Sequence, residues 1–201
     1  MYDWRLERER AAQTVPSGYR QYVDKLDGYS FNIPGDWAAV TSSGNDVFFR
    51  NIFNVNENVF VGLSSPSSKK YDSLSVLGDP DKAAKQILKQ CLDELGTTRL
   101  GVKREGEVVT ASRRTGPDGR EYYDVQLRVK SFASRNQLAV YQRKLDSGLQ
   151  LEWDRRYITT LGVANNQLYQ LRLQTATKQY DKSEGMLLDI AHSFQCTEVE
   201  K

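Results

Sequence analysis

The chain has 201 residues, of which 27% are charged and 39% apolar, and this is the size and composition of one soluble globular domain. It contains no run of about 18 apolar residues, which argues against a membrane-spanning helix, and its first thirty residues lack the apolar stretch of a signal peptide. A net charge of +2 is too small to indicate binding to nucleic acid.

Residues 1–18 are rich in charge and have no sustained apolar period, so we predict a mobile N-terminal arm ahead of a single domain at residues 19–201. An aromatic hairpin is expected next, because Asp27-Gly28 is a strong turn signal between two strands. Pro34-Gly35 ends the second strand of this hairpin, and Trp37 is expected to cap the core nearby.

Two more strands and a helix are predicted in the middle of the chain. The strands are Val47–Arg50 and Asn58–Ser64. The helix begins at Asp79-Pro80, because Asp is a favoured N-cap and Pro a favoured first helical residue, and it ends at Gly96. The residues of its apolar face recur at helical spacing: Ala84, Ile87, Leu88, Cys91, Leu92 and Leu95.

A long hairpin follows this helix, with arms at Val102–Ser112 and Arg120–Phe132. Residues 132–148 fit either a short strand or an excursion from the sheet. Because most strands are joined by hairpins, the sequence predicts an α+β fold in which helices pack on a mainly antiparallel sheet.

A strand, a tight turn, a second strand and a helix are predicted at the C-terminal end. Asn165-Asn166 supplies the turn, since Asn tolerates the positive φ that a tight hairpin needs. Asp181 lies three residues before Glu184, the spacing of a capping box at a helix N-terminus. Phe194 is the last core contact expected of this helix, and no other contact is expected for the tail beyond it.

Motifs of catalysis are absent from the sequence. The single histidine, His192, lies beside the apolar face of the last predicted helix, where a partly packed surface role is expected. The sequence has no phosphate loop, dinucleotide fingerprint or C-x-x-C pair. We therefore predict a protein without enzymatic activity, catalytic residues, metal ligands or a cofactor.

Positive charge is concentrated between Arg99 and Lys144, where eleven Lys or Arg face five Asp or Glu. One interpretation is a solvated strand face. The other is a docking surface for an acidic partner, and its candidates flank the turn of the long hairpin. These candidates are Lys103, Arg104, Arg113 and Arg114.

Several stretches, taken together in order and spacing, resemble the PsbP-domain family between residues 20 and 196. They are Gly28-Tyr-Ser-Phe-Asn-Ile-Pro-Gly-Asp-Trp37, Val59-Phe-Val-Gly-Leu-Ser-Ser-Pro66, Leu77-Gly-Asp-Pro80, Arg120-Glu-Tyr-Tyr-Asp-Val-Gln-Leu127, Arg155-Arg-Tyr-Ile-Thr-Thr160, Asn166-Gln-Leu-Tyr-Gln-Leu171 and Ser193-Phe194. The resemblance implies an α/β/α sandwich around an antiparallel sheet, shared with the Mog1-like fold. The N-terminal arm differs from that of the photosystem II subunit of this family, and residues 132–148 look like extra length between two core strands. Both differences favour a paralogue over that subunit itself.

The resemblance also implies a function. It implies an extrinsic protein of the chloroplast thylakoid lumen that is peripheral to the membrane and monomeric. Such a protein would bind photosystem subunits or assembly intermediates and support their assembly or stability without catalysis. Calcium binding accompanies the family, although no residue here is assigned to it. The alternatives are a soluble regulator of a small GTPase, as Mog1-like proteins are, and an enzyme with an unrecognised site.

The only two cysteines, Cys91 and Cys196, are a candidate disulfide, because a pair in an oxidising compartment is commonly joined. Against the bond, the two helices that precede or carry them could cover opposite faces of the sheet. The Cα atoms would then lie beyond the roughly 7 Å that a disulfide spans. A disulfide and two free thiols therefore both remain open.

Overall fold

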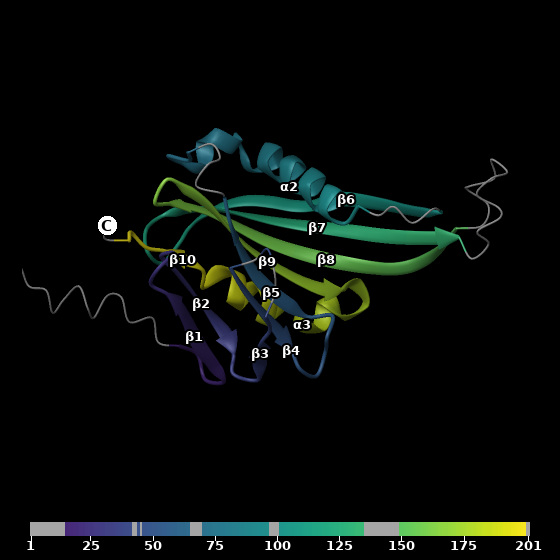
Figure 1. The fold of residues 1–201 in the computed structure, drawn as a ribbon, viewed down its shortest axis with the longest axis horizontal. Helices are drawn as coiled ribbons and strands as arrows, with labels where there is room; N and C mark the ends of the chain where they lie inside the picture. The colour runs from purple at the N-terminus through teal and green to yellow at the C-terminus, as the bar shows by residue number, and fades with distance from the viewer. Residues whose placement is uncertain are drawn as a thin grey trace, which may run out of the picture.

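The computed structural model describes residues 15–41, 44, 46–64, 70–96, 101–134 and 149–199. Within them the strands form a seven-stranded sheet of order β3-β4-β5-β9-β8-β7-β6 and a three-stranded sheet of order β1-β2-β10 (Figure 1). All the strand pairs are antiparallel. The elements are β1 Tyr19–Asp24, β2 Tyr29–Pro34, β3 Trp37–Ala39, β4 Val47–Asn51, β5 Asn58–Leu63, η1 Leu74–Leu77, α2 Pro80–Glu94, β6 Val102–Thr115, β7 Glu121–Ser134, β8 Leu149–Ala164, β9 Gln167–Ala176, η3 Thr177–Gln179, α3 Tyr180–His192 and β10 Gln195–Cys196.

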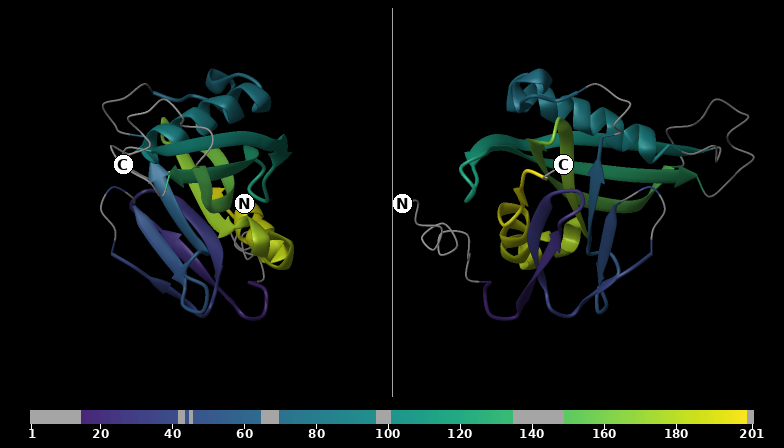
Figure 2. Two further views of the ribbon diagram at one scale, coloured as in Figure 1. Left: turned by 90° about the vertical axis from the view of Figure 1, so that its right-hand side faces the viewer. Right: turned by 60° about the vertical axis from the view of Figure 1, so that its left-hand side comes forward.

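The two helices lie on opposite faces of the seven-stranded sheet. Helix α2 covers β6 and β7 on one face, whereas α3 packs on β8 and β9 on the other and also contacts β2 of the small sheet (Figures 1 and 2). Each face has its own apolar cluster, one beneath α2 and one beneath α3. The predicted α+β class, with helices packed on an antiparallel sheet, is confirmed.

Helix α2 forms as its sequence predicts. Asp79 is the N-cap, and its side chain accepts a hydrogen bond of 2.8 Å from the backbone N–H of Lys82, while Pro80 is the first helical residue. Its buried residues, at helical spacing, are Ala83, Ala84, Ile87 and Cys91. A glycine in β6 permits the close approach of the helix, because a Cβ on Gly106 would lie 2.7 Å from Leu88.

The N-terminal hairpin has its expected turn but does not join the main sheet. Its second strand, β2, is fully covered at Tyr29, Phe31 and Ile33, and Trp37 is 2% exposed just beyond it. This strand pairs with β1 on one side and with β10 on the other, where Cys196 lies opposite Tyr29. The expectation that the tail beyond Phe194 makes no further contact with the domain is therefore wrong.

The β8–β9 hairpin has the predicted turn, since Asn165 and Asn166 have φ values of 52° and 60°. The predicted capping box after it is wrong. The short helix η3 leads directly into α3, so the N-cap is Gln179, which makes no side-chain capping bond. Glu184 instead accepts a hydrogen bond of 3.0 Å from the hydroxyl of Tyr180.

Two sequence predictions fall mainly outside the described residues. Residues 1–14 of the predicted arm are outside them, while residues 15–18 are exposed. Gly18 still contacts the domain, because its carbonyl accepts a 2.9 Å hydrogen bond from the N–H of Gly35. Residues 132–134 belong to β7, and residues 135–148 are outside the described part of the chain.

Candidate functional site

The four basic candidates do not form one surface. Lys103 and Arg104 lie at the start of β6 and Arg113 and Arg114 near its end, so the two pairs are roughly 30 Å apart at the usual rise per residue. Only the second pair flanks the hairpin turn. A register shift between Val108 and Thr110 also changes the side-chain alternation, so that Lys103 and Arg113 project from opposite faces.

The members of the second pair differ in their surroundings. Arg113 is exposed, pairs with Glu121 at 3.2 Å and lies over the ring of Tyr123. The side chain of Arg114 is 17% exposed, and its guanidinium bonds Asp124 at 2.6 Å and the carbonyl of Ala191 in α3 at 3.1 Å. Arg114 therefore ties β6 to α3, and the prediction that it projects freely for docking is wrong.

The first pair is also engaged within the fold. Lys103 lies 3.0 Å from Glu105, with both side chains about half exposed. Arg104 lies on the α2 face, 5.9 Å from the ring centre of Trp153. Of the four candidates, Arg113 and Lys103 keep the exposure that docking requires, and each has a glutamate partner.

The two cysteines are free and buried, and they belong to different apolar clusters. Cys91 belongs to the cluster beneath α2, whereas Cys196 belongs to the cluster beneath α3, and the sheet separates them. The candidate disulfide is therefore not formed in this structure. Burial raises the pKa of both thiols, that of Cys196 to about 12, which keeps them protonated and weakly nucleophilic.

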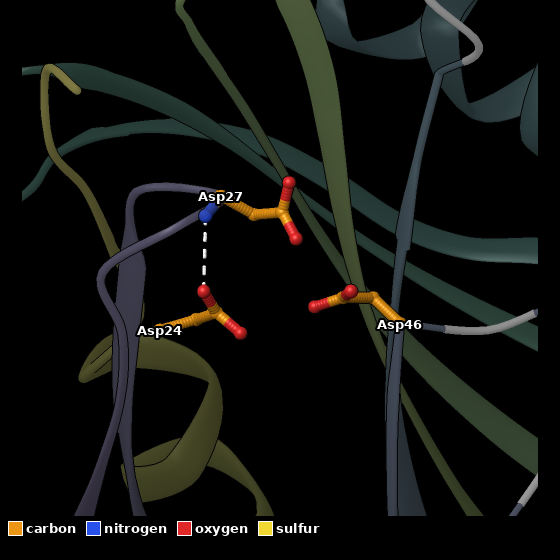
Figure 3. Close-up of side chains that lie close together, drawn as sticks. All are labelled: Asp24, Asp27 and Asp46. Carbon is orange, nitrogen blue, oxygen red and sulfur yellow. Dashed lines mark hydrogen bonds between the residues drawn. The ribbon is translucent and has the colours of Figure 1, made fainter. Parts of the chain in front are cut away.

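Three carboxylates converge at the β1–β2 turn: Asp24, Asp27 and Asp46, with one oxygen of each lying within 4.8 Å of the others (Figure 3). Asp24 accepts hydrogen bonds of 2.9 Å from the backbone N–H groups of Leu26 and Asp27. Tyr29 donates its hydroxyl to Asp46. Burial, and then the charges of Asp46 and Asp24, raise the pKa of Asp27.

These three carboxylates are the residues of the described chain that could hold a cation. They offer three oxygens, whereas calcium takes about 6–8, so most of its ligands would have to come from backbone and water. Sequence reasoning missed the cluster, because Asp46 reaches the turn only through the fold. Two aspartates three residues apart at a hairpin turn were the available signal.

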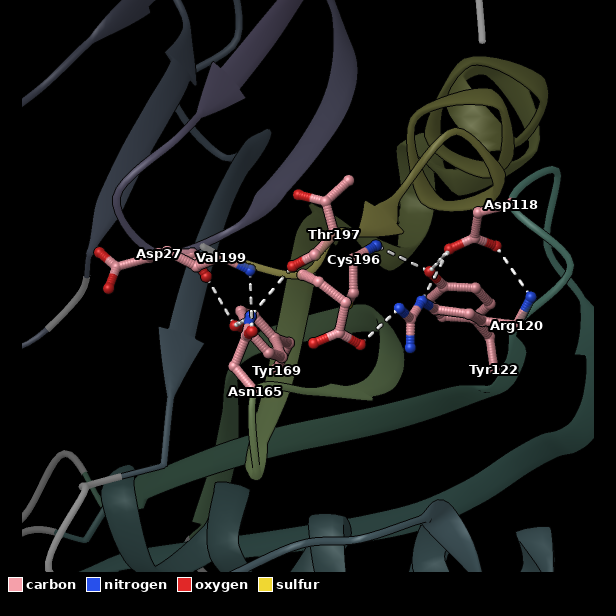
Figure 4. A network of polar contacts seen from close by, with 10 residues as sticks. Asp27, Asp118, Arg120, Tyr122, Asn165, Tyr169, Cys196, Thr197 and Val199 are labelled. Atoms are coloured by element: carbon pink, nitrogen blue, oxygen red, sulfur yellow. Dashed lines mark hydrogen bonds and ion pairs between the residues drawn. The ribbon is translucent and has the colours of Figure 1, made fainter. Parts of the chain in front are cut away.

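A second polar cluster joins the β1–β2, β6–β7 and β8–β9 hairpins to the C-terminal tail (Figure 4). We call this cluster the clasp, and its members are Asp27, Asp118, Arg120, Tyr122, Asn165, Tyr169 and residues 196–199. Asn165, in the β8–β9 turn, donates 2.9 Å and 3.0 Å bonds to the hydroxyl of Tyr169 and the carbonyl of Thr197. It also accepts a 3.0 Å bond from the N–H of Val199. Tyr169 in turn donates a 2.6 Å bond to the carbonyl of Asp27.

The other half of the clasp is centred on Tyr122 in β7. Its buried hydroxyl donates a 2.5 Å bond to Asp118 and accepts a 2.8 Å bond from the N–H of Cys196. Beside it, Arg120 pairs with Glu198 of the tail at 2.7 Å. Burial, as the largest cause, raises the pKa of Tyr122, so the hydroxyl keeps its proton as a donor. The clasp is thus a structural device that fixes the tail.

The single histidine is on the surface, as predicted. The side chain of His192 is 53% exposed and lies 3.8 Å from Asp124, the carboxylate that Arg114 also binds.

No helix among the described residues is long and apolar enough to cross a membrane.

Comparison with known proteins identifies the family. A model of the PsbP family matches residues 17–196, so the chain belongs to that family. PsbP domain-containing protein 1, chloroplastic, of Arabidopsis thaliana is 43% identical over 181 residues, which are 90% of this chain and 62% of that protein. The predicted membership of the family, as a PsbP-domain paralogue, is confirmed.

A more distant relative is the photosynthetic NDH subunit of lumenal location 1, chloroplastic, also of Arabidopsis thaliana. It is 20% identical over 190 residues, which are 94% of this chain and 66% of the relative. The chain therefore spans somewhat less than two thirds of the length of each of these relatives.

Two solved structures share the fold. The solution structure of cyanobacterial PsbP (CyanoP) from Synechocystis sp. PCC 6803 has a TM-score of 0.64 and 24% identity, covering 92% of this chain and 96% of that one. A mutant of protein Mog1 has a TM-score of 0.51 and 11% identity, covering 90% and 96% of the two chains. The predicted PsbP/Mog1-like fold is confirmed, and at these identities the likeness extends to the fold alone.

Proposed function

We propose that this protein is an extrinsic accessory protein of the thylakoid lumen, peripheral to the membrane and monomeric. It binds subunits or assembly intermediates of a photosynthetic membrane complex and supports their assembly or stability without catalysis. One observation carries the proposal: the PsbP-family match spans residues 17–196, and a chloroplastic PsbP-domain protein is 43% identical over 90% of the chain. The lumenal name of the second relative supports the compartment.

The chemistry of the described residues supports binding over catalysis. The two thiols have raised pKa values, and the exposed histidine lies beside a carboxylate that an arginine already binds. Nucleophilic catalysis instead requires a lowered pKa or an adjacent base. The alternative of a small-GTPase regulator rests on the Mog1 fold at 11% identity, which carries no function by itself.

Affinity capture tests the proposal. Tagged full-length protein is mixed with detergent-solubilised thylakoids, the bound proteins are identified by mass, and a tag-only bait is the control. We expect subunits of one photosynthetic membrane complex to be enriched. Enrichment of a small GTPase without such subunits would favour the rival function, and capture equal to the tag-only bait would contradict binding. Protection of the native protein from protease, lost when thylakoids are permeabilised, tests the compartment.

Docking through positive charge remains part of the proposal, with Arg113 as its best-placed residue. Reversal of Arg113 alone leaves the buried pair of Arg114 with Asp124 intact, so it changes surface charge without breaking the fold. If Arg113 meets an acidic partner, capture by the Arg113→Glu variant weakens, and capture by the wild type falls as salt rises. Capture equal to wild type at all salt concentrations would remove this residue from the interface.

A further inference from the structure

The loop between β4 and β5 exposes three large apolar side chains in four residues. Ile52, Phe53 and Val55 are 54%, 81% and 63% exposed. Single exposed apolar residues are common on proteins, but a contiguous group marks an interaction site or a liability to aggregate. The loop lies at the end of β4 away from the carboxylate cluster, close to the start of α3 (Figure 1).

Hydrogen bonds hold this loop in one conformation. The side-chain oxygen of Asn51 accepts from the N–H groups of Phe53 and Asn54 at 2.9 Å and 3.2 Å. The amide of Asn51 donates to Glu57 at 2.7 Å, and that of Asn54 donates to Gln179 at 2.8 Å. The apolar side chains are therefore presented by an ordered loop, which lowers the entropy lost when a partner binds.

A groove of about 530 Å³ adjoins the loop, and Asn56 of the loop is one of its walls. Its apolar walls are Leu151, Trp153 and Ala176, and Leu151 is 56% exposed. This volume is within the range of about 300–1,000 Å³ usual for ligand sites. A flat bilayer surface would cover the loop but leave the groove unfilled, whereas a protruding side chain of a protein would fill it.

The acidic groups on the rim of the groove are engaged by the protein itself. Asp154 accepts bonds of 2.7 Å and 3.1 Å from Arg128 and a bond of 2.6 Å from Thr177. These interactions are among the causes that lower its pKa, against the opposing effect of burial. Glu152 accepts a bond of 3.1 Å from Ser131.

The basic groups on the same rim are an exposed lysine and a half-buried arginine. Lys178 is exposed, and Arg155 stacks on the ring of Trp153 with 4.4 Å between its guanidinium carbon and the ring centre. Neither has an ion pair within the part of the chain that the structure describes. The rim thus offers positive charge beside an apolar groove, and tryptophan and arginine are the residues most enriched where binding energy is concentrated.

We infer that the β4–β5 loop and the groove form one docking surface, which we call the apolar end: Ile52, Phe53, Val55, Leu151 and Trp153 with Arg155 and Lys178 on the rim. It binds a segment of a partner protein in which an aromatic or large aliphatic side chain lies next to Asp or Glu. The apolar side chain enters the groove, and the carboxylate meets Lys178 and Arg155. This inference rests on the proposed function and adds to it the surface and the chemistry of the partner.

The experiment uses full-length protein and a synthetic array of overlapping peptides that cover the lumen-exposed segments of thylakoid membrane complexes. Peptides that combine an apolar anchor with an acidic residue are expected to bind. The affinity falls by about tenfold or more in the Phe53→Ser/Val55→Ser double variant and in Leu151→Ser, the size typical of a removed anchor. Lys178→Glu weakens the binding of the same peptides and reduces the salt dependence of that binding, because Arg155 is the positive charge that remains on the rim.

Matched controls separate this surface from general stickiness. Leu26, in the β1–β2 turn, is 87% exposed, so Leu26→Ser removes an equally exposed apolar side chain from a distant place. Lys25→Glu is the matched charge reversal in that turn. Both controls should bind the peptides as the wild type does. All these side chains are exposed or line an open groove, so thermal melts should confirm that every variant is folded.

Five outcomes would overturn the inference, of which four come from measurements on the purified protein. The first is the absence of any binding peptide, and the second is peptide binding that is unchanged in both apolar variants. The third is binding of the wild type, through Phe53, to vesicles of phosphatidylglycerol and phosphatidylcholine instead of peptides. The fourth is self-association in sedimentation that the double variant abolishes. Capture of membrane-complex subunits by the double variant at wild-type levels would reject the apolar end and leave the proposed function standing. Failure of the wild type to capture them would reject the function itself.

Discussion

The two ends of β4 differ in the partners that their polar side chains bind. At its beginning, around Asp46 and the nearby clasp, polar side chains bond to backbone groups from segments far apart in the sequence, as Tyr169 does with Asp27. At its end, the polar side chains of the β4–β5 loop bond mostly to neighbours within the loop and leave Phe53 in solvent.

This difference separates stability from binding. A bond between distant segments, once lost, releases a whole segment, so substitutions in the clasp should lower the free energy of unfolding. Exposed apolar side chains on a local loop contribute little to folding, because they are nearly as solvated in the folded chain as in the unfolded chain. Substitutions at the apolar end should therefore change binding and leave stability unchanged.

The largest expected loss of stability follows reversal of Arg114 near the clasp. In Arg114→Glu a second carboxylate faces Asp124 in a mostly buried site, and the free energy of unfolding should fall by about 3 kcal/mol. Arg113→Glu is the matched control, and since its pair with Glu121 is half exposed, it should lose less than about 1 kcal/mol. Urea unfolding measures both, and equal losses would show that the burial of Arg114 is unimportant.

A methyl group added inside the clasp is expected to cost about 2 kcal/mol. A Cβ on Gly162 would lie 2.7 Å from the ring of Tyr122 and 2.9 Å from the sulfur of Cys196, so Gly162→Ala overpacks the site. Gly62→Ala is its control, because nothing lies within 4 Å of the added Cβ in β5. Unfolding curves in urea should shift for the first variant alone, and an unshifted Gly162→Ala would mean that the tail moves freely.

Removal of the Asn165 side chain tests the link to the tail. Asn165→Ala loses three hydrogen bonds and keeps a positive φ, which together should cost about 1–2 kcal/mol. Asn166→Ala carries a similar φ, so it isolates the backbone contribution. Amide hydrogen exchange at Cys196 and Thr197 should speed up in the first variant much more than in the second. Similar exchange in both would assign the effect to the turn and not to the tail.

The smallest effect is expected in the carboxylate cluster. The pKa of Asp27 is raised, so the folded state binds its proton more tightly than the unfolded chain does, and stability falls as pH rises above about 4 through the raised value. Asp27→Asn removes this loss. Its free energy of unfolding should therefore exceed that of the wild type by less than about 1 kcal/mol at pH 7, and should equal it below a pH of about 4. Asp36→Asn, at an exposed carboxylate, is the control. A melting temperature of the wild type that rises with calcium, and does so less in Asp27→Asn, would instead show that the cluster binds a cation.

Local sequence patterns predicted much of the fold. Asp79-Pro80, the two arms of the long hairpin and the Asn165-Asn166 turn are local signals, and the structure confirms each of them. The capping box at Asp181 is a local signal that failed, because η3 continues directly into α3 and moves the start of the helix.

The candidate sites could not be predicted in the same way, because they join distant residues. Strand β10 and the clasp depend on contacts such as the N–H of Thr197 with the carbonyl of Gly28. The four basic docking candidates do not share one surface, because β6 is long and has an irregularity near Val108, which changes the face that each side chain takes. The sequence places Leu151 on a half-buried strand and Phe53 between two predicted strands, and only the packed structure shows that both side chains are exposed.

The most direct test of the separation between the two ends measures stability and binding on the same two variants. Gly162→Ala and the Phe53→Ser/Val55→Ser double variant are each compared with the wild type by urea unfolding and by capture of membrane-complex subunits from solubilised thylakoids. We expect the first variant to lose stability and, at a temperature where it is folded, to bind normally. The second should unfold as the wild type does and capture about tenfold less. A double variant that loses stability but captures normally would contradict the account.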